Sequence, residues 1–294
     1  MPARILVIGR SGQLASELAR LPCPPGVVIE AAGRELFDLA KIAEIPGNLR
    51  ELRADAVINA AAYTAVDQAE SEPAAAFALN RDGPAALARA CADLNLPLVH
   101  LSTDYVFDGA KASPYSEADP KAPLNVYGRS KSEGEDAILA SGANAIVLRT
   151  SWVFAAHGTN FLRTMLKLAE AKDEVRVVAD QIGRPTWARD LARASLTACL
   201  RALDRDPAAR GLYHFAGAGD ASWADFAEAI FAEAAACGVK AARVVRIPSA
   251  GFPRPAPRPA NSRLDTAKIA GALAIQPRDW REACALCVAE TLGA

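Results

Sequence analysis

The sequence ARILVIGRSGQLAS (residues 3–16) runs from an apolar segment through a glycine turn into the start of a helix. ARILVIG (3–9) is a short apolar run ending in glycine, which is typical of a buried strand. The segment QLASELARL that follows has helical spacing. The turn between them has the pattern G-x-x-G-x-x-A, with Gly9, Gly12 and Ala15. This order predicts a strand–turn–helix unit at the start of the chain.

Such a turn has a known use when it follows a buried strand. The first glycine permits a tight turn, the second lets the backbone approach a pyrophosphate, and the small third residue lets helix and strand pack closely. The helix N-terminus then faces the phosphates. A glycine pair alone is a weak signal, and an ordinary βα turn is the alternative. The strand–turn–helix context favours a dinucleotide site.

Further strand and helix patterns alternate along the first half of the chain. Apolar strands are expected at 26–34, 55–62, 96–103 and 144–154, with a helical stretch at 38–52 that Pro46 and Gly47 interrupt and an alanine-rich helix at 72–95. This alternation predicts a parallel sheet covered by helices on both faces, that is, an α/β Rossmann-like doubly wound fold. We expect residues 1–155 to form the NAD(P)-binding domain.

The pattern is looser after residue 155. Helices are expected at 159–171, 187–204, 222–237 and 277–292, and short strands near 175–178, 211–215 and 243–247. The proline-rich stretch GFPRPAPRPANSR (251–263) is irregular, as segments that cover binding sites often are. We expect 156–294 to be a smaller, irregular α/β substrate domain whose segments interleave with the first domain.

Composition excludes several classes of protein. Half of the 294 residues are hydrophobic, which is enough for a sizeable core. The 33 basic and 34 acidic residues nearly cancel, so the electrostatic pattern of a nucleic-acid-binding protein is missing. No apolar run reaches the roughly 20 residues that span a bilayer. We recognise no leader segment and expect a cytoplasmic protein.

The segment PLNVYGRSKSEGE (123–135) places Tyr127 and Lys131 four residues apart. At this spacing the two side chains lie on one face of a helix. A nearby ammonium and a cationic nicotinamide favour the phenolate and bring the pKa of the tyrosine toward the working range. Upstream, STD (102–104) ends the fourth expected strand, at the sheet edge where such folds bind ligands. A hydroxyl there can polarise a ketone while the tyrosine delivers a proton. The set predicts an NAD(P)-dependent reductase.

The residues at the end of the second expected strand indicate whether the cofactor is NAD or NADP. NAD-binding proteins usually carry an acid at this point, whereas a basic residue favours the extra phosphate of NADP. In the strand expected at 26–34, Glu30 lies before the end and Arg34 lies at the end, where its guanidinium can hold a 2′-phosphate. A solvated loop arginine is the alternative. We expect NADPH, with NADH as the second choice.

The chain resembles the extended short-chain dehydrogenase/reductases, and within them the dTDP-4-dehydrorhamnose reductase family. The similar segments include GRSGQLASEL, VINAAAYTAVDQAESEP, LSTDYVFDG, PLNVYGRSKSEGE, LRTSWVF, GTNFLRTML and RPANSRLDT, in the family's order between residues 9 and 266. The resemblance implies hydride transfer from NAD(P)H to C4 of dTDP-4-dehydro-L-rhamnose, which gives dTDP-L-rhamnose.

The resemblance also implies roles for individual residues. Tyr127 would be the proton donor, Lys131 its partner and Thr103 the polarising hydroxyl. The cofactor would contact Gly9, Gly12, Gln13, Leu14, Asp38, Leu39, Ala62, Tyr63 and Thr64, in addition to Arg34, Tyr127 and Lys131. The substrate would contact Thr103, Asp104, Phe107, Trp152, Asn160, Asn261, Ser262 and Arg263. The alternatives are that Asp38 caps a helix, that Trp152 belongs to the core and that Phe107 anchors a loop.

One departure from the family's pattern concerns metal. Members of this family have been described with magnesium held by glutamates at a dimer contact. Glu17 fits one such position, but Arg189 stands where another carboxylate would be needed. Magnesium takes oxygen ligands, so we expect no metal, and we expect Arg189 to pair with Glu17 or another acid. The sequence leaves a homodimer open.

Two other functions remain open at this point. A nucleotide-sugar epimerase or 4,6-dehydratase would use the same fold, but the related dehydratases carry Asp-Glu after the strand-end threonine, and here Asp104 precedes Tyr105. A non-catalytic NADP-binding regulatory subunit is the other alternative, although Thr103, Tyr127 and Lys131 are all retained.

Overall fold

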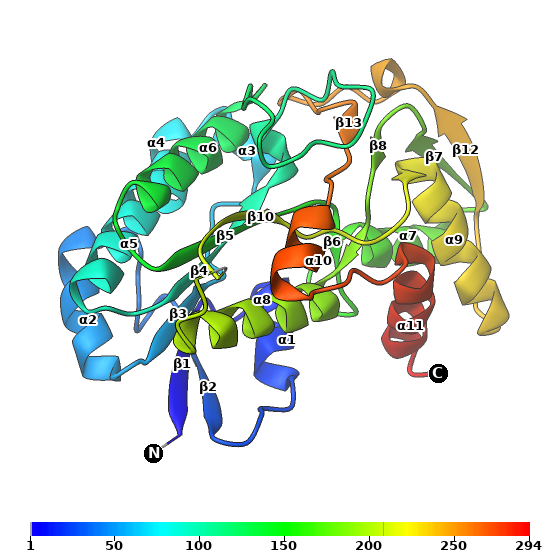
Figure 1. Cartoon of the computed structure of the whole chain (residues 1–294). Coiled ribbons are helices and arrows are strands. Elements are labelled where there is room, and N and C mark those ends of the chain that lie inside the picture. The colour runs from blue at the N-terminus through cyan, green and yellow to red at the C-terminus, as the bar shows by residue number, and fades with distance from the viewer. Residues whose placement is uncertain (1, 208) are drawn as a thin grey trace.

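The structure is a computed structural model that describes residues 2–207 and 209–294. Its largest sheet has six parallel strands in the order β2-β1-β3-β4-β5-β10 (Figure 1). These strands are β1 (Ala3–Ile8), β2 (Val27–Ala32), β3 (Ala56–Asn59), β4 (Leu98–Thr103), β5 (Ala145–Thr150) and β10 (Gly211–His214). The strand order reverses at β1 and β3, which creates a crevice at their carboxyl ends. The predicted doubly wound parallel sheet is confirmed.

Helices cover both faces of this sheet, as Figure 1 shows. One face carries α1 (Gln13–Arg20) and α8 (Ala188–Leu203), and the other carries α2 (Ile45–Leu52), α5 (Gly83–Asp93) and α6 (Val126–Leu139). Alternate residues of β1 enter the two cores. Ile5 and Val7 pack on the α1 and α8 side, and Leu6 and Ile8 pack on the α2 and α5 side. Burial on both faces is why β1 is apolar throughout.

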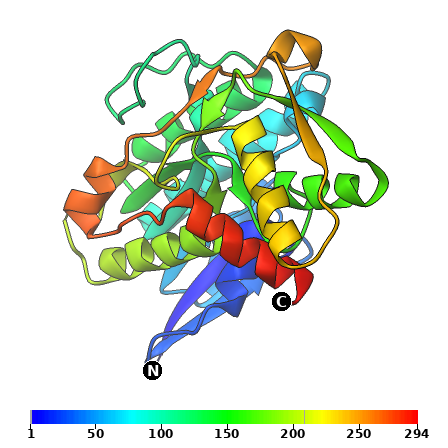
Figure 2. The same cartoon turned by 90° about the vertical axis from the view of Figure 1, so that its right-hand side faces the viewer.

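The rest of the chain builds a second core beside the sheet. The parallel pair β7 (Glu174–Val178) and β12 (Arg243–Ile247) packs with α7 (Phe161–Ala171), α9 (Trp223–Ala236) and α11 (Trp280–Leu292) (Figure 2). Shorter strands pair as β6 (Val153–Phe154) with β9 (Thr186–Trp187), and as β11 (Ala221–Ser222), β8 (Ile182–Gly183) and β13 (Asn261–Ser262). The remaining helical segments are η1 (Ile42–Glu44), α3 (Val66–Ala69), α4 (Pro73–Phe77), η2 (Ala78–Asp82), η3 (Asp104–Val106), η4 (Ser249–Gly251) and α10 (Ala267–Leu273).

Two expected helices differ from the structure. The helix expected at 72–95 is interrupted by the π-helical turn η2, in which the buried Asn80 bonds the backbone N–H and C=O of Tyr63. Such π-turns are frequent near functional sites. The stretch expected at 38–52 is α-helical only in α2, which follows the 3-10 turn η1, and Pro46 lies in the first turn of α2, where a missing N–H costs nothing.

The strand expected at 144–154 is also divided. Trp152 has φ of +49°, which stops β5 and turns the chain into the separate strand β6. The sequence does not mark this break with a glycine, and the apolar residues Trp152, Val153 and Phe154 resume the strand pattern after three polar residues.

Segments from beyond residue 155 complete the large sheet: β10 is an edge strand and α8 covers one face. The division of the chain at residue 155 stays a prediction.

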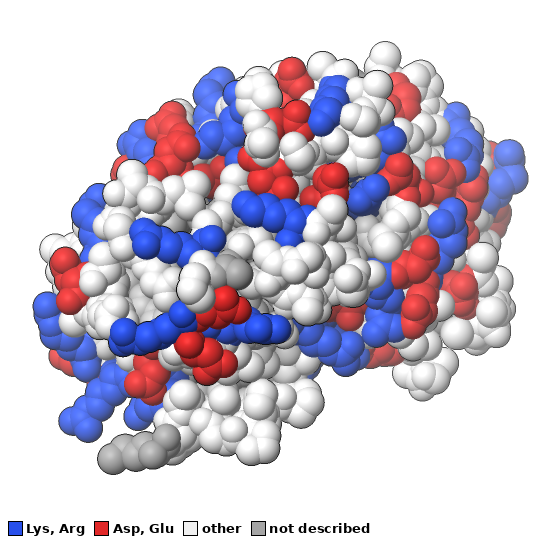
Figure 3. All heavy atoms as spheres, viewed as in Figure 1, with Lys and Arg blue, Asp and Glu red and all other residues white. Residues whose placement is uncertain are grey.

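Charges of both signs alternate over the face of the molecule shown in Figure 3, without a field of one sign. Among residues 2–207 and 209–294, no helix is both long and apolar enough to cross a membrane.

Candidate functional site

The glycine turn after β1 has the geometry of an anion-binding loop. Gly9 has φ of +112°, a conformation that residues with a Cβ rarely adopt, so this glycine makes the tight turn. Gly12 is the N-cap of α1, and no side chain caps the first turn there. A Cβ built on Gly12 meets no heavy atom within 4 Å, so the backbone is open to a ligand. The exposed helix N-terminus therefore suits a phosphate group.

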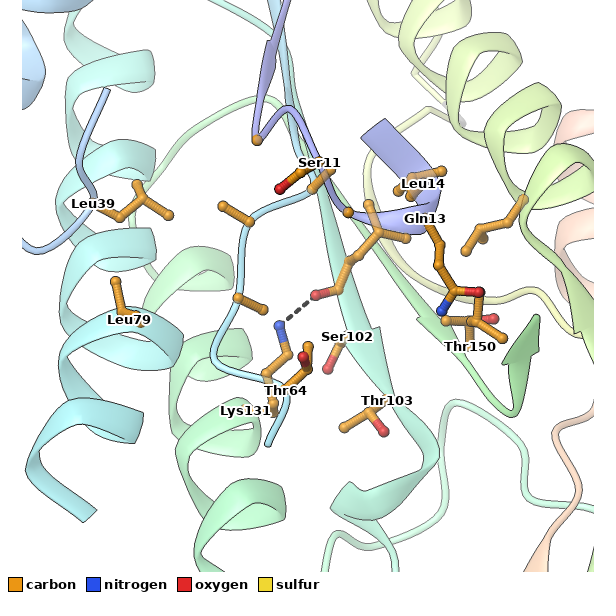
Figure 4. Close-up of a pocket in the computed structure, with 18 of the residues that line it drawn as sticks. Ser11, Gln13, Leu14, Leu39, Thr64, Leu79, Ser102, Thr103, Lys131 and Thr150 are labelled. Atoms are coloured by element: carbon orange, nitrogen blue, oxygen red, sulfur yellow. Dashed lines mark hydrogen bonds between the residues drawn. The ribbon is translucent and has the colours of Figure 1, made fainter. Parts of the chain in front are cut away.

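A cavity of about 780 Å³ lies over the carboxyl ends of β1, β3, β4 and β5. Figure 4 shows Ser11, Gln13 and Leu14 on one side, Lys131 on α6 opposite, and Ser102 and Thr103 at the end of β4. The structure brings most of the predicted site residues to this wall. They are Gly9, Gly12, Gln13, Leu14, Arg34, Asp38, Leu39, Ala62, Thr64, Thr103, Asp104, Tyr127, Lys131 and Trp152.

Four buried polar atoms on this wall have no hydrogen-bond partner among residues 2–207 and 209–294. They are Oε1 of Gln13, Oγ of Ser102, Oδ2 of Asp104 and Oγ1 of Thr150. Buried polar atoms are nearly always paired, and an unpaired one calls for an explanation. Because all four line one cavity, a polar ligand that bonds to them there is the simplest explanation.

Helix α6 positions the tyrosine and the lysine. The Asn125 side chain caps it by accepting the N–H of Gly128 at 2.8 Å, which starts the helix just before Tyr127. A Cβ on Gly128 would collide with the carbonyl oxygen of Tyr105, so the glycine lets α6 approach η3. Tyr127 and Lys131 consequently lie one turn apart on the face that lines the cavity. Their predicted placement on one helix face is confirmed.

Lys131 is buried, with 2% of its surface exposed. Its Nζ donates to the carbonyl oxygen of Leu101 at 2.5 Å, the dashed line in Figure 4, and lies 3.2 Å from Nε2 of His100. Burial lowers the pKa of this lysine to about 8, although the carboxylate of Glu135 acts in the opposite direction. The lysine therefore changes protonation within reach of neutral pH.

Burial raises the pKa of Tyr127 to about 12, and the carboxyl of Asp104 adds to the increase. A hydrogen bond with the Thr103 hydroxyl is the contact that lowers this pKa. The lysine was expected to do so, but in the structure its Nζ is bonded to β4 instead. Without a bound cofactor Tyr127 thus keeps its proton, which is the state that a proton donor requires.

Thr103 and Asp104 lie where β4 passes into η3, and both are buried. The Thr103 hydroxyl is 3.2 Å from Oδ1 of Asp104 and accepts the N–H of Tyr105 at 3.2 Å, which fixes its direction. Burial raises the pKa of Asp104 to about 7, while the nearby hydroxyls of Ser262 and Thr103 oppose the rise. Near neutral pH this carboxyl can therefore donate as well as accept a hydrogen bond.

Arg34 is exposed at the rim of the cavity, in the turn after β2. Its Nε donates to Oδ2 of Asp38 at 3.2 Å, and Oδ1 of Asp38 accepts the N–H of Ala40 at 3.0 Å. The sequence did not single out Arg10, which lines the same part of the cavity and pairs with Glu35 at 2.7 Å. Two exposed guanidinium groups thus flank the place expected to hold a 2′-phosphate.

Trp152 lines the cavity with its backbone in the left-handed region. Its ring stacks on Trp223 of α9, with centroids 3.5 Å apart and planes 9° from parallel. A side chain on Gly183 would collide with the ring. The second core therefore holds Trp152 at the cavity wall from behind.

Six predicted site residues lie off the cavity wall: Tyr63, Phe107, Asn160, Asn261, Ser262 and Arg263. The Tyr63 hydroxyl donates to Glu72 at 2.8 Å, and Phe107 stacks on Tyr115 in a small core. Asn160 caps α7, and Asn261 bonds the carbonyl oxygens of Lys111 and Ser113. Phe107 thus has the environment of a packed loop anchor. Ligand contacts by these six stay a prediction.

Sequence reasoning missed the polar residues beneath the cavity. Ser102, next to the last residue of β4, and Thr150, the last of β5, have hydroxyls without a partner in the described part of the chain, and His100 and Asn59 lie under Lys131. The available signal was that polar residues interrupt strands that are otherwise apolar, near the carboxyl edge of the sheet. Ser102 was quoted only as part of STD.

Glu17 of α1 is fully buried and lies between two basic side chains. Its Oε2 accepts Nε of Arg189 at 2.9 Å, and its Oε1 lies 2.9 Å from Nε2 of His157. Arg189 also donates to Glu290 of α11 at 2.6 Å. The predicted direct pairing of Arg189 with Glu17 is confirmed. One guanidinium therefore joins α1, α8 and α11 where the family pattern would have carboxylates around a cation.

This arrangement predicts tolerance of chelators. Because the Arg189 guanidinium stays protonated and already neutralises Glu17, we expect EDTA to change neither the activity nor the apparent mass in solution. Both would be measured before and after chelation, with and without added magnesium. A loss that magnesium restores would contradict this interpretation of Arg189.

The site combines three features: a parallel doubly wound sheet, a glycine turn at a helix N-terminus, and a Tyr-x-x-x-Lys helix that lines the same cavity. Together they define an oxidoreductase of the short-chain dehydrogenase/reductase class. Comparisons with known proteins narrow this class. Residues 3–292 match the family model described as the RmlD substrate binding domain. The dTDP-4-dehydrorhamnose reductase of Sinorhizobium fredii is 47% identical over 280 residues, covering 95% of this chain and 94% of that protein. The chain belongs to this family, that of the dTDP-4-dehydrorhamnose reductases.

Solved structures agree with this assignment. The dTDP-4-dehydrorhamnose reductase of Bacillus anthracis, in complex with NADP, has a TM-score of 0.92 and 32% identity, covering 99% of this chain and 100% of that one. UDP-glucose 4-epimerase of Thermus thermophilus, in complex with NAD, has a TM-score of 0.81 and 21% identity, covering 99% of each chain. The latter likeness concerns the fold alone.

Proposed function

We propose that this protein reduces the C4 ketone of dTDP-4-dehydro-L-rhamnose with NADPH, giving dTDP-L-rhamnose. The observation that carries the proposal is the convergence of Thr103, Tyr127 and Lys131 on the cavity next to the glycine turn, in a chain of this family. The names of the relatives supply the substrate. The cytoplasm as compartment and a homodimer as assembly stay predictions.

The residues present fit a dinucleotide. The open backbone at Gly12 and the uncapped N-terminus of α1 would hold the pyrophosphate, and Lys131 would reach the ribose next to the nicotinamide. Leu39 and Asp38 would lie near the adenine, and Ala62 and Thr64 along the cofactor. When bound, NADPH supplies the hydride. The unpaired Ser102 and Thr150 hydroxyls mark the deep end of the cavity as polar.

The chain's own part of the chemistry is to orient the ketone and supply a proton. The Thr103 hydroxyl would bond the C4 oxygen, and the protonated Tyr127 would donate to the same oxygen as negative charge develops on it. For the threonine to keep its proton for this bond, Asp104, whose Oδ1 is 3.2 Å away, would be protonated and donate to the Thr103 hydroxyl oxygen. Trp152 would cover the sugar from the side of the second core. A proton and a hydride thus reach the two ends of one carbonyl bond.

The two alternative functions, an epimerase or dehydratase and a regulatory subunit, differ from a reductase in whether they consume NADPH. A dehydratase would need a second carboxylate after Thr103, but Asp104 is followed by the tyrosine of η3. Incubation with NADPH and dTDP-4-dehydro-L-rhamnose separates the three functions. A reductase oxidises one NADPH per product, an epimerase or dehydratase recycles its nucleotide, and a regulatory subunit does neither. Absence of stoichiometric NADPH oxidation would exclude the proposal.

Cofactor choice provides a further prediction. If Arg34 holds the 2′-phosphate, Arg34→Ala should weaken NADPH by about 1–3 kcal/mol, the usual worth of a charged hydrogen bond, and leave NADH nearly unchanged. Dissociation constants for both nucleotides would be measured by fluorescence titration. Arg50→Ala is the matched control, since Arg50 is an exposed arginine of α2 away from the cavity. If the substitution weakened NADPH and NADH equally, or weakened neither, Arg34 would be a loop residue that does not bind the 2′-phosphate.

A further inference from the structure

His100 is a fully buried histidine that the proposed reaction does not yet use. It lies on β4 between the buried side chain of Asn59 on β3 and the ammonium end of Lys131 on α6. Its Nδ1 is 3.0 Å from Nδ2 of Asn59, and its Nε2 is 3.2 Å from Nζ of Lys131. The three side chains form a continuous polar chain under the cavity floor.

The direction of this chain is set by a backbone group. The N–H of Ala61 donates to the Asn59 side chain at 3.1 Å, so the atom facing it must be the oxygen Oδ1. The amide nitrogen Nδ2 then faces His100 and donates to Nδ1. A neutral imidazole that accepts at Nδ1 carries its proton on Nε2. Burial, and then the charge of Lys131, hold the pKa of His100 well below its usual value, so the ring stays neutral.

The proton on Nε2 has a consequence for Lys131. An ammonium group has three donors and no acceptor, whereas an amine has a lone pair. The 3.2 Å contact is therefore a hydrogen bond only if Lys131 accepts it as an amine, while an N–H of the same group donates to Leu101. With an ammonium, two donors would face each other in a buried site.

We propose that Asn59 and His100 form a hydrogen-bond chain of fixed direction that favours the amine form of Lys131 in the unliganded protein. His100 is a positioning residue in this scheme, because it acts through Lys131. Burial of the lysine acts in the same direction, since it lowers the pKa of Lys131 to about 8.

Other charged groups around α6 do not remove the preference of Lys131 for the amine form. Glu135, which favours the ammonium, is paired bidentately with Arg149 of β5 at 2.8 and 2.7 Å. Glu133 is paired with Arg81 of η2. The remaining titratable or charged residues on α6 and on the elements packed against it are Asp67, Asp82, Arg89, Cys91, Asp93, Asp104, Tyr105, Tyr127, Arg129 and Asp136, and Glu70 lies just after α3.

The consequence for catalysis rests on the proposed function. An amine at Lys131 does not acidify Tyr127, so the tyrosine enters the cycle as a neutral proton donor. The negative phosphates of a bound dinucleotide then favour the ammonium form, which can hold the ribose. Lys131 would thus gain its proton when the cofactor arrives.

Nitrogen-15 NMR of the imidazoles tests the chain without any substrate. The sequence has three histidines, and His157→Gln removes the signals of the least buried one. His214 is an internal reference with the opposite tautomer, because its Nδ1 faces the carbonyl oxygen of Tyr115 at 3.1 Å and its Nε2 faces the Arg149 guanidinium at 3.3 Å. We expect two neutral rings, one protonated on Nε2 and one on Nδ1. Two rings protonated on Nδ1, or an imidazolium at pH 7, would overturn the proposal.

Asn59→Asp should reverse the chain with almost no change in shape. The carboxylate accepts from both Ala61 and His100, so the His100 proton moves to Nδ1 and Nε2 becomes an acceptor for the ammonium. We expect the pH at which NADPH affinity declines to rise by about one unit or more. Asn144→Asp, which adds a carboxylate near the opposite edge of the sheet, should leave that pH unchanged. If a folded Asn59→Asp protein lost NADPH affinity at the same pH as the parent protein, the proposal would be contradicted.

If the Asn59→Asp variant does not fold, the imidazole tautomers measured by NMR in the wild-type protein test the proposal by themselves. Neither the NMR spectrum nor the NADPH affinity depends on turnover. A failure of the proposed reduction can therefore be distinguished from a failure of this proposal.

Discussion

Replacing Tyr127 with phenylalanine is expected to lower the rate of ketone reduction by about 10²–10⁴-fold, the usual contribution of a positioned general acid. The variant keeps the ring, including its edge contact with Tyr105 at a centroid distance of 5.5 Å, and loses only the transferable proton. NADPH affinity should therefore change little. Single-turnover kinetics at saturating NADPH would measure the rate of the chemical step.

Tyr105→Phe is the matched control for this result. Tyr105 also lines the cavity and also has a raised pKa, but it lies outside the Thr103–Tyr127–Lys131 set. We expect this control to retain most of the rate. If Tyr127→Phe turned over at a near-normal rate, Tyr127 would not be the proton donor.

Arg149→Met is expected to destabilise the fold by about 3–5 kcal/mol, the cost of leaving one member of a buried ion pair alone. Arg149 of β5 is 2% exposed and holds the fully buried Glu135 of α6 with two parallel bonds. The guanidinium also lies over the Phe107 ring, 4.9 Å from its centroid. In the variant, Lys121, at 3.6 Å, would be the one basic partner left to Glu135 among the described residues. Equilibrium unfolding in urea would measure the loss.

A double variant separates the charge effect from packing. In Arg149→Met/Glu135→Leu both charges are replaced by apolar groups, which is often neutral or stabilising in a buried site. We expect it to recover most of the lost stability. If the single variant were within about 1 kcal/mol of the parent protein, as for an ordinary surface substitution, the pair would not be important for stability.

The periodic elements of the fold were predictable because their patterns are local. β1 alternates its side chains between two cores, and the apolar run 3–9 already showed a strand buried on both faces. The break at Trp152 was not predictable, because it depends on Trp223 and Gly183, which are distant in sequence. The π-turn at Asn80 likewise depends on bonds to Tyr63 and to the Ser130 hydroxyl at 3.0 Å.

The site was predictable to the extent that its residues come in spaced motifs. Tyr127 and Lys131 are joined by one helix, and Gly9 and Gly12 by one turn, so sequence spacing fixed their relation. The partner of Lys131 comes from β4, and no local pattern links His100 to a lysine 31 residues later. The expectation that the lysine acidifies the tyrosine therefore stays a prediction for the protein with bound cofactor. Arg189 was the exception, because its unusual charge at a family position pointed to Glu17 or another acid as its partner, and it pairs with Glu17 and Glu290.

Transfer of deuterium tests the central claim most directly. The protein would be incubated with dTDP-4-dehydro-L-rhamnose and NADPH carrying deuterium at the transferable position of the nicotinamide. NMR and mass spectrometry of the nucleotide sugar would then locate the label. We predict dTDP-L-rhamnose with one deuterium at C4 and one oxidised cofactor per product. A product without label at C4, or a substrate unchanged while NADPH stays reduced, would contradict the proposed reduction.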